Sequence, residues 1–260
     1  MKKDIKKTLI LSDIDGTFLD DNSKQVQANL DAIKKYTASG GNFAFSTGRI
    51  QKSVPECIPG WKELMNVPAI MCNGAYLYDA KTDELLHRVP LDKDYIMPVL
   101  YDLREKFPEL KIRVTVYPCV TLTNPDIDAR REITTELHKV VVVGEKELVD
   151  EVREYVYAKC GDNLAYSKSC DIFLEFLNPL ATKGTQLDWL REYLGGDVTV
   201  YAVGDFDNDA DMLRHADVPA CPSNGYPPIV AYCREHGLVM CDNNTGTIAD
   251  LVEHIMRECE

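Results

Sequence analysis

The sequence predicts an α/β fold, in which a Rossmann-like parallel-sheet core is interrupted by an inserted α+β domain. Short apolar strands alternate with helical segments at both ends of the 260-residue chain, and this alternation implies parallel pairing with right-handed crossovers. An acidic cluster follows a strand in each of these end segments. The middle of the chain has a different order of predicted helices and strands. We therefore expect residues 1–82 and 182–260 to form the core and residues 83–181 to form the insertion.

The elements of the core follow from apolar runs and helical spacing. Residues 8–11 (TLIL) predict a buried strand, and Val26, Leu30 and Ile33 recur at the spacing of a helix that Gly40 and Gly41 end. Further strands are predicted at 42–45, 68–72 and 198–203, and further helices at 183–194 and 210–215.

The inserted segment contains strands that are candidates for antiparallel pairing. We expect helices at 92–107 and 145–160, and strands at 111–123, 138–143, 164–167 and 171–177. This order of elements is typical of an α+β domain.

Composition and charge restrict the possible partners. Hydrophobic residues make up 45% and charged residues 27%, as in soluble globular proteins. The net charge of −13 argues against nucleic acid or an anionic membrane as the main partner, because both attract basic surfaces. The nine cysteines include no C-x-x-C pair, which favours free thiols in a reducing compartment. The apolar run near the N-terminus is too short for a signal peptide, so we expect a cytoplasmic protein. No required protein partner is evident.

Two acidic clusters mark the expected chemistry. Asp13-Ile14-Asp15-Gly16-Thr17 follows strand 8–11, and GDFDND at 204–209 follows strand 198–203. The carboxyl ends of parallel strands are where such sheets bind ligands. Two like charges 4 Å apart repel by about 4 kcal/mol at an effective dielectric constant near 20. A divalent cation relieves this repulsion, and hard oxygen ligands suit Mg²⁺. The sequence therefore predicts a Mg²⁺ site at this edge of the sheet.

With these motifs the chain resembles the phosphatases of the haloacid dehalogenase (HAD) superfamily, in the Cof-like subgroup with a C2-type α/β cap. D-x-D-G-T lies at 13–17, a threonine at Thr47 within STGR, a lysine at Lys183 within NPLATKG and GDxxND at 204–209. The match spans essentially the whole chain. It departs from the family pattern at Cys221 and Pro222, which replace the usual small residues before Asn224.

The resemblance implies a role for each acidic residue. Asp13 would be the nucleophile that forms an aspartyl-phosphate, and Asp15 would act as general acid and then as general base. Mg²⁺ would be held by Asp13, Asp205 and the backbone carbonyl of Asp15, with Asp209 nearby.

Other residues are expected to bind substrate. Lys183 opens a helix, whose N-terminal N–H groups also attract anions, although a single lysine there is usually solvated. Arg49 either clamps a second anionic or hydroxyl-rich part of the substrate or lies on the surface. Asn208 either orients Asp205 or Lys183, or forms an Asx turn. The resemblance implies that Thr47 and Lys183 are catalytic residues that bind the transferring phosphoryl oxygens, although Thr47 could instead cap a helix. Asn73-Gly74 and Asn224-Gly225 resemble loops that line the cleft in this family, and both pairs are also ordinary turn sequences. The complete set of substrate candidates is Thr47, Gly48, Arg49, Asn73, Lys183, Asn208 and Asn224.

We therefore expect a Mg²⁺-dependent phosphatase of a small phosphorylated metabolite, with sugar phosphates favoured and the cap selecting the leaving group. One alternative is a phosphomutase or phosphotransferase, which passes the phosphoryl group to a sugar hydroxyl. Another is a metabolite sensor without turnover. A signalling receiver domain also combines Asp, Thr and Lys on a parallel sheet, but it lacks the insertion and the second acidic cluster. Dehalogenase chemistry is disfavoured, because it needs neither Mg²⁺ nor an acid at Asp15.

Overall fold

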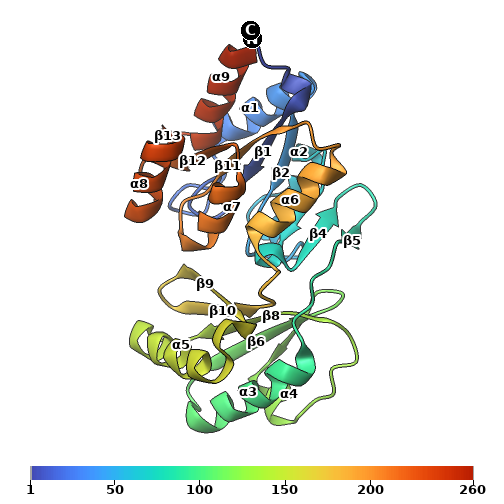
Figure 1. Ribbon diagram of the computed structural model, residues 1–260, viewed down its shortest axis with the longest axis vertical. Helices are drawn as coiled ribbons and strands as arrows, with labels where there is room; N and C mark the ends of the chain where they lie inside the picture. The colour runs from blue at the N-terminus through green and yellow to red at the C-terminus, as the bar shows by residue number, and fades with distance from the viewer. Residues whose placement is uncertain (1, 260) are drawn as a thin grey trace. The chain divides into compact units, whose positions relative to one another are not determined.

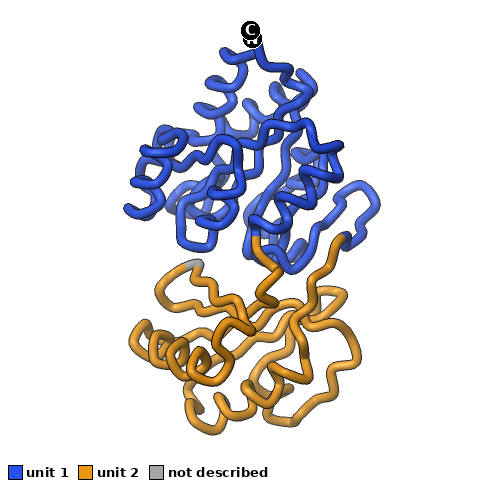
Figure 2. Tube along the Cα trace, viewed as in Figure 1, with its two compact units in different colours: residues 1–86, 183–260 blue, residues 87–182 orange. Residues whose placement is uncertain are grey.

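The computed structural model describes residues 2–259 and divides the chain into two compact units (Figures 1 and 2). Unit 1 comprises residues 1–86 and 183–260, and unit 2 comprises residues 87–182. The first boundary lies after residue 86 rather than 82, because strand Glu84–Leu86 pairs with strand Tyr76–Asp79 within unit 1.

A five-stranded parallel sheet forms the core of unit 1, in the order β13-β12-β11-β1-β2 (Figure 1). Its strands are β1 (Thr8–Ser12), β2 (Asn42–Phe45), β11 (Thr199–Val203), β12 (Val218–Pro222) and β13 (Leu238–Met240). The central strand β1 is buried along its whole length, as its unbroken apolar run predicts. Ser12 pairs with Val203 on one side and with Phe45 on the other. The three strands therefore end at the same level, and the predicted α/β class with a parallel core is confirmed.

The helices of unit 1 pack in pairs, α1 with α9 and α6 with α7, while α8 packs on β12. They are α1 (Gln27–Ala38), α2 (Trp61–Leu64), α6 (Lys183–Tyr193), α7 (Ala210–His215), α8 (Pro227–His236) and α9 (Thr247–Cys259). The chain leaves α1 through Gly40, whose φ of +98° is a conformation that favours glycine. No helix or strand was predicted after residue 215. One reason is that β12 contains Pro219 and Pro222, which count against a central strand.

Residues 68–72, expected as another strand of the parallel pattern, make one parallel bridge, between Ile70 and Ser46 just beyond β2, and otherwise pair antiparallel. They contribute β3 (Ala69–Met71) to a three-stranded antiparallel sheet with β4 (Tyr76–Asp79) and β5 (Glu84–Leu86). The turn at Asn73-Gly74 returns the chain at once, and so short a connection cannot make the crossover that a parallel pair needs.

Unit 2 is built on an antiparallel sheet in the order β7-β6-β8-β10-β9. Its elements are α3 (Lys93–Lys106), β6 (Lys111–Val116), β7 (Val120–Thr123), α4 (Asn124–Asp128), β8 (Leu137–Val143), α5 (Lys146–Cys160), β9 (Ala165–Cys170) and β10 (Phe173–Leu177). The single strand expected at 111–123 is a hairpin, because a turn at residues 117–119 divides it. Within residues 2–259, no helix combines the length and apolarity that a membrane crossing requires.

Asn29 links the loop after β1 to the start of α9. Its side chain is fully buried, donates to the carbonyl of Phe18 (3.0 Å) and accepts the N–H groups of Ile248 (3.1 Å) and Ala249 (3.0 Å). Three backbone groups at the edge of the core therefore depend on one amide side chain.

We predict that Asn29→Ala lowers the free energy of unfolding by about 2–4 kcal/mol, because it leaves buried polar groups without partners. Urea denaturation measures this change. Gln27→Ala is the control, since Gln27 lies on the same helix and bonds only to the exposed side chain of Asp31 in the described contacts (2.9 Å). A loss in Asn29→Ala no larger than in the control would contradict the prediction.

Candidate active site

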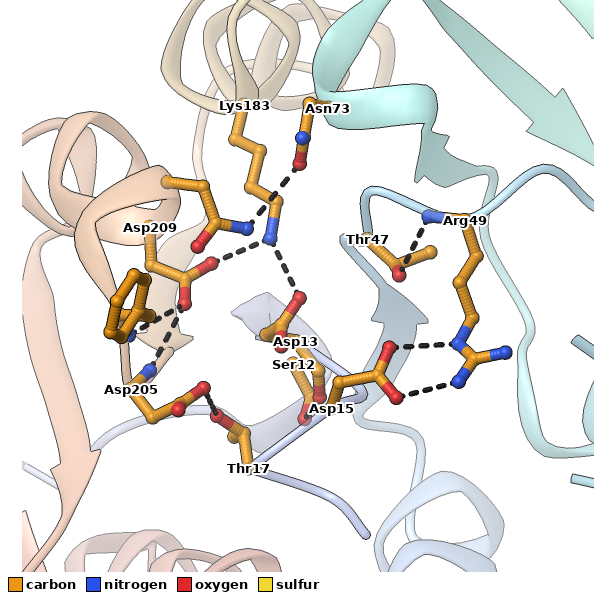
Figure 3. A network of polar contacts seen from close by, with 12 residues as sticks. Ser12, Asp13, Asp15, Thr17, Thr47, Arg49, Asn73, Lys183, Asp205 and Asp209 are labelled. Carbon is orange, nitrogen blue, oxygen red and sulfur yellow. Dashed lines mark hydrogen bonds and ion pairs between the residues drawn. The ribbon is translucent and has the colours of Figure 1, made fainter. Parts of the chain in front are cut away.

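Three loops of unit 1 leave the parallel sheet at the same edge and bring the predicted residues together (Figure 3). The ladder continues one step beyond the strands: the Asp13 N–H donates to the carbonyl of Val203 (2.9 Å), and the Ser46 N–H donates to that of Ser12 (2.8 Å). The loops after β1, β2 and β11 therefore start side by side, and the sheet register fixes the positions of their side chains.

The buried ammonium group of Lys183 lies between two carboxylates. Its Nζ atom is 2.7 Å from Oδ1 of Asp13 and 2.6 Å from Oδ1 of Asp209. The side chains of Lys183 and Asp209 are 0% exposed, and that of Asp13 is 6% exposed. Burial alone would lower the pKa of this ammonium, but the two carboxylates outweigh it and raise the pKa. Lys183 is therefore a fixed positive charge.

The second acidic motif folds back on itself and reaches the first. Oδ2 of Asp209 accepts the N–H groups of Asp205 (3.0 Å) and Phe206 (3.3 Å). The hydroxyl of Thr17 donates to Oδ1 of Asp205 (2.9 Å). Gly16 has a φ of +80°, and a Cβ there would lie 2.3 Å from Oδ2 of Asp205. Glycine at this position is thus what lets the two motifs touch.

Asp13, Asp205 and Asp209 form a cluster whose donor oxygens lie within 4.8 Å of one another. Burial raises the pKa of Asp13 well above its usual range, although Lys183 opposes this. Burial, with the charge of Asp209 adding to it, raises the pKa of Asp205 to about 7. Carboxyl groups that resist ionisation in this way fit a site completed by a divalent cation, and the all-oxygen donor set suits Mg²⁺. We call these three residues the carboxylate cluster.

Asp15 points away from this cluster and forms an ion pair with Arg49 (Figure 3). Nε and Nη2 of Arg49 donate to the two carboxylate oxygens of Asp15, each at 2.7 Å. These hydrogen bonds raise the pKa of the guanidinium group. A contribution of Asp15 to a metal would therefore come from its backbone carbonyl. Arg49 was predicted to be either a substrate clamp or a surface residue, and this pair was missed, although both residues follow neighbouring parallel strands.

Three of the remaining candidates meet around a fourth, Asn73. The Thr47 carbonyl accepts the Asn73 N–H (2.9 Å), and the Thr47 hydroxyl accepts the Arg49 N–H (3.1 Å). The Asn208 amide donates to Oδ1 of Asn73 (3.4 Å). A Cβ at Gly48 would lie 3.1 Å from the amide of Asn73. The structure therefore brings Thr47, Gly48 and Asn208 to one residue, Thr47 at its backbone and the other two at its side chain.

The turn that carries Asn73 has an unusual backbone. Cys72, Asn73 and Gly74 have successive φ values of +57°, +55° and +99°. Asparagine and glycine tolerate this region, whereas Cys72 is strained there. The Gly74 carbonyl accepts the side chain of Gln186 on α6 (2.8 Å), so the turn is tied to the helix that begins with Lys183. Such strain is often found at functional sites.

Asn224 does not contact the carboxylate cluster in the described hydrogen bonds. Its amide donates to Oδ1 of Asn243 (2.6 Å), and the Asn243 N–H donates back to Oδ1 of Asn224 (3.2 Å). Asn243 was not predicted as a site residue. Its position just after a strand would have been the signal, but strand β13 was not predicted.

Comparison with known proteins identifies the family of this chain. The sequence profile of the family described as haloacid dehalogenase-like hydrolase matches residues 10–124 and 118–252. A Streptococcus pyogenes protein, whose name calls it a phosphatase only provisionally, is 26% identical over 246 residues, 85% of this chain and 89% of its own. The 5-amino-6-(5-phospho-D-ribitylamino)uracil phosphatase of Bacillus subtilis is 24% identical over 243 residues, 85% of this chain and 88% of its own.

A solved structure gives the same result for the fold. A haloacid dehalogenase-like hydrolase from Bacillus subtilis has a TM-score of 0.81 and 20% identity, over 95% of this chain and 99% of that one. With a family profile that covers most of the sequence, the resemblance drawn from the motifs is confirmed. This chain belongs to the haloacid dehalogenase-like hydrolases.

Proposed function

We propose that this protein is a Mg²⁺-dependent phosphatase that hydrolyses a small phosphorylated metabolite through an aspartyl-phosphate. The observation that carries the proposal is the carboxylate cluster around the buried ammonium of Lys183. This arrangement offers a nucleophile, a fixed positive charge and oxygen donors for a cation within one site. The phosphatase names of its relatives support the reaction, and the phosphorylated ribityl compound named for one relative supports a sugar-like substrate.

In the first step, the Asp13 carboxylate attacks phosphorus and the ester bond to the leaving oxygen breaks. Asp15 gives its proton to that oxygen, so the metabolite departs as a neutral alcohol. Lys183 and Thr47 hold the oxygens of the transferred phosphoryl group. When bound at Asp13, Asp205 and the Asp15 carbonyl, Mg²⁺ supplies charge neutralisation for the phosphate.

In the second step, water attacks the phosphorus of the aspartyl-phosphate and Asp15 takes up the proton. Asp13 is regenerated and inorganic phosphate leaves. The two hydrogen bonds from Arg49 fix the orientation of the Asp15 carboxylate. Because a general acid must be held within reach of the atom it protonates, we assign Arg49 to positioning Asp15 rather than to clamping substrate.

Asp13→Asn tests the nucleophile. We predict that phosphate release from p-nitrophenyl phosphate and from a panel of phosphorylated metabolites falls by at least about 10³-fold, because the amide cannot form the intermediate. Circular dichroism checks that the variant is folded, and Asp31→Asn on the exposed face of α1 is the control. Near-normal turnover of Asp13→Asn would rule out the assignment. Formation of an isomeric sugar phosphate instead of free phosphate by the unmodified protein would favour a mutase.

Arg49→Ala separates positioning from substrate clamping. We predict that kcat for glycerol 3-phosphate falls about tenfold or more, because an alkoxide needs a proton from a well-placed acid. The effect on p-nitrophenyl phosphate should be smaller, since nitrophenolate leaves without that proton. Arg191→Ala is the control, because Arg191 forms a similar pair with Asp217 (2.7 Å). A rise in KM with unchanged kcat would instead support the clamp.

The pKa of Asp205 predicts how metal-free stability depends on pH. Because burial raises this pKa to about 7, the folded state holds a proton that the unfolded state loses near pH 4. The folded state therefore binds more protons between these pH values, and the free energy of unfolding falls as pH rises through that window.

We predict that Asp205→Asn removes this decline. In EDTA, the difference in unfolding free energy between the two proteins should change by about 2–4 kcal/mol from pH 4.5 to 7.5. Urea denaturation across that range measures it. Adding Mg²⁺ at pH 7.5 should stabilise the unmodified protein more than the variant. Parallel pH profiles for the two proteins would show that Asp205 is not the titrating group.

A further inference from the structure

We propose that Asn243 is a positioning residue for Asp205, acting through Asn224 and the loop that follows β12. The inference rests on the proposed function, in which Asp205 binds Mg²⁺. Asn243 itself lies outside the carboxylate cluster. Asn243 would therefore affect the position of the loop that carries Asp205 and would not touch the reacting atoms.

Asn243 is 1% exposed and joins three loops at the edge of the sheet that carries the site. Its Nδ2 atom donates to the Leu19 carbonyl (3.0 Å) and to Oδ1 of Asp21 (3.1 Å), both in the loop after β1. Two reciprocal hydrogen bonds join it to Asn224 in the loop after β12. Asn243 itself follows β13. One amide thus fixes three segments that are distant in sequence.

The loop after β12 also holds the backbone of Asp205. The N–H of Tyr226 donates to the Asp205 carbonyl (2.8 Å), and the N–H of Gly225 closes the turn on Pro222 (3.1 Å). A Cβ at Gly225 would lie 3.3 Å from the same carbonyl oxygen. Asn224 stands directly before these two residues. Its pairing with Asn243 therefore determines where the support for Asp205 lies.

The loop after β1 holds Asp205 from the other side. The hydroxyl of Thr17 donates to the Asp205 carboxylate (2.9 Å), and the N–H of Leu19 donates to the Ile14 carbonyl (3.0 Å) within the same loop. Because Asn243 binds this loop at Leu19, it connects the two supports of Asp205. Loss of the Asn243 side chain would break this connection at Leu19 and loosen one support relative to the other.

Asn66 provides a matched comparison within unit 1. Its side chain donates to the Gly41 carbonyl (2.9 Å) and accepts the N–H of Phe43 (2.8 Å), so it also ties a loop to the sheet. These contacts lie at the start of β2, whereas the site lies beyond its end. A purely structural role for Asn243 predicts the same consequences for both asparagines.

The test is Mg²⁺ binding to the full chain without substrate, measured by isothermal titration calorimetry. Outer partners of metal ligands typically contribute 10–100-fold to affinity, so Asn243→Ala should raise the Kd for Mg²⁺ by about tenfold or more. Asn224→Ala breaks the same link from its other end and should have a similar effect. The double variant should be little worse than either single one, because both changes remove one connection. Asn66→Ala should lower the free energy of unfolding but leave the Kd within about twofold.

The outcomes separate the two proposals. If the unmodified protein binds Mg²⁺ and both Asn243→Ala and Asn224→Ala bind it equally well, the positioning role is overturned and the proposed function stands. An Asn66→Ala variant that loses as much affinity as Asn243→Ala would also overturn it, since general destabilisation would then explain both. If the unmodified protein does not bind Mg²⁺, both proposals fall. Asn224→Ala keeps the test decisive where Asn243→Ala does not fold.

Discussion

The buried ion pairs of Lys183 with Asp13 and Asp209 are the constraint on which the site depends. Three carboxylates within 4.8 Å of one another could not all ionise without a compensating charge, because like charges at such a distance repel by several kcal/mol even at an effective dielectric constant near 20. Lys183 compensates one of them. Burial, with the charge that remains adding to it, raises the pKa values of Asp13 and Asp205, and that charge is what a divalent cation would neutralise. In the proposed function, Mg²⁺ would relieve this imbalance.

The parallel sheet brings acids from distant parts of the sequence to one edge, where even neighbouring acids have different environments. Ser12 pairs with both Phe45 and Val203, so the loops that follow begin at one level. Within these loops Asp13 is 6% exposed beside Lys183, whereas the side chain of Asp15 is 50% exposed and held by Arg49. The proposed mechanism gives these two carboxyl groups different tasks, Asp13 as the buried nucleophile and Asp15 as the general acid and base. Environment rather than residue type separates such roles.

Much of this arrangement could be predicted from the sequence, because it depends on local patterns. The strand before Asp13, the strand before Asp205 and the helix that begins at Lys183 are all visible in short apolar runs and spacing. What the sequence did not show depends on which loops meet in space. The pairing of Arg49 with Asp15 and that of Asn224 with Asn243 join residues 34 and 19 positions apart. Strand β12 was hidden by its prolines, and β3 has one parallel bridge to Ser46 but turns back at once to pair antiparallel with β4.

The most direct test of the account is to identify the residue that becomes phosphorylated. Borohydride reduces an acyl phosphate. The protein is therefore treated with borohydride during turnover of a phosphorylated metabolite, and its peptides are sequenced by mass spectrometry to locate the reduced residue. The account predicts reduction at Asp13 when Mg²⁺ is present, and none when EDTA replaces it. Modification at any other carboxylate, or at Asp13 regardless of Mg²⁺, would contradict it.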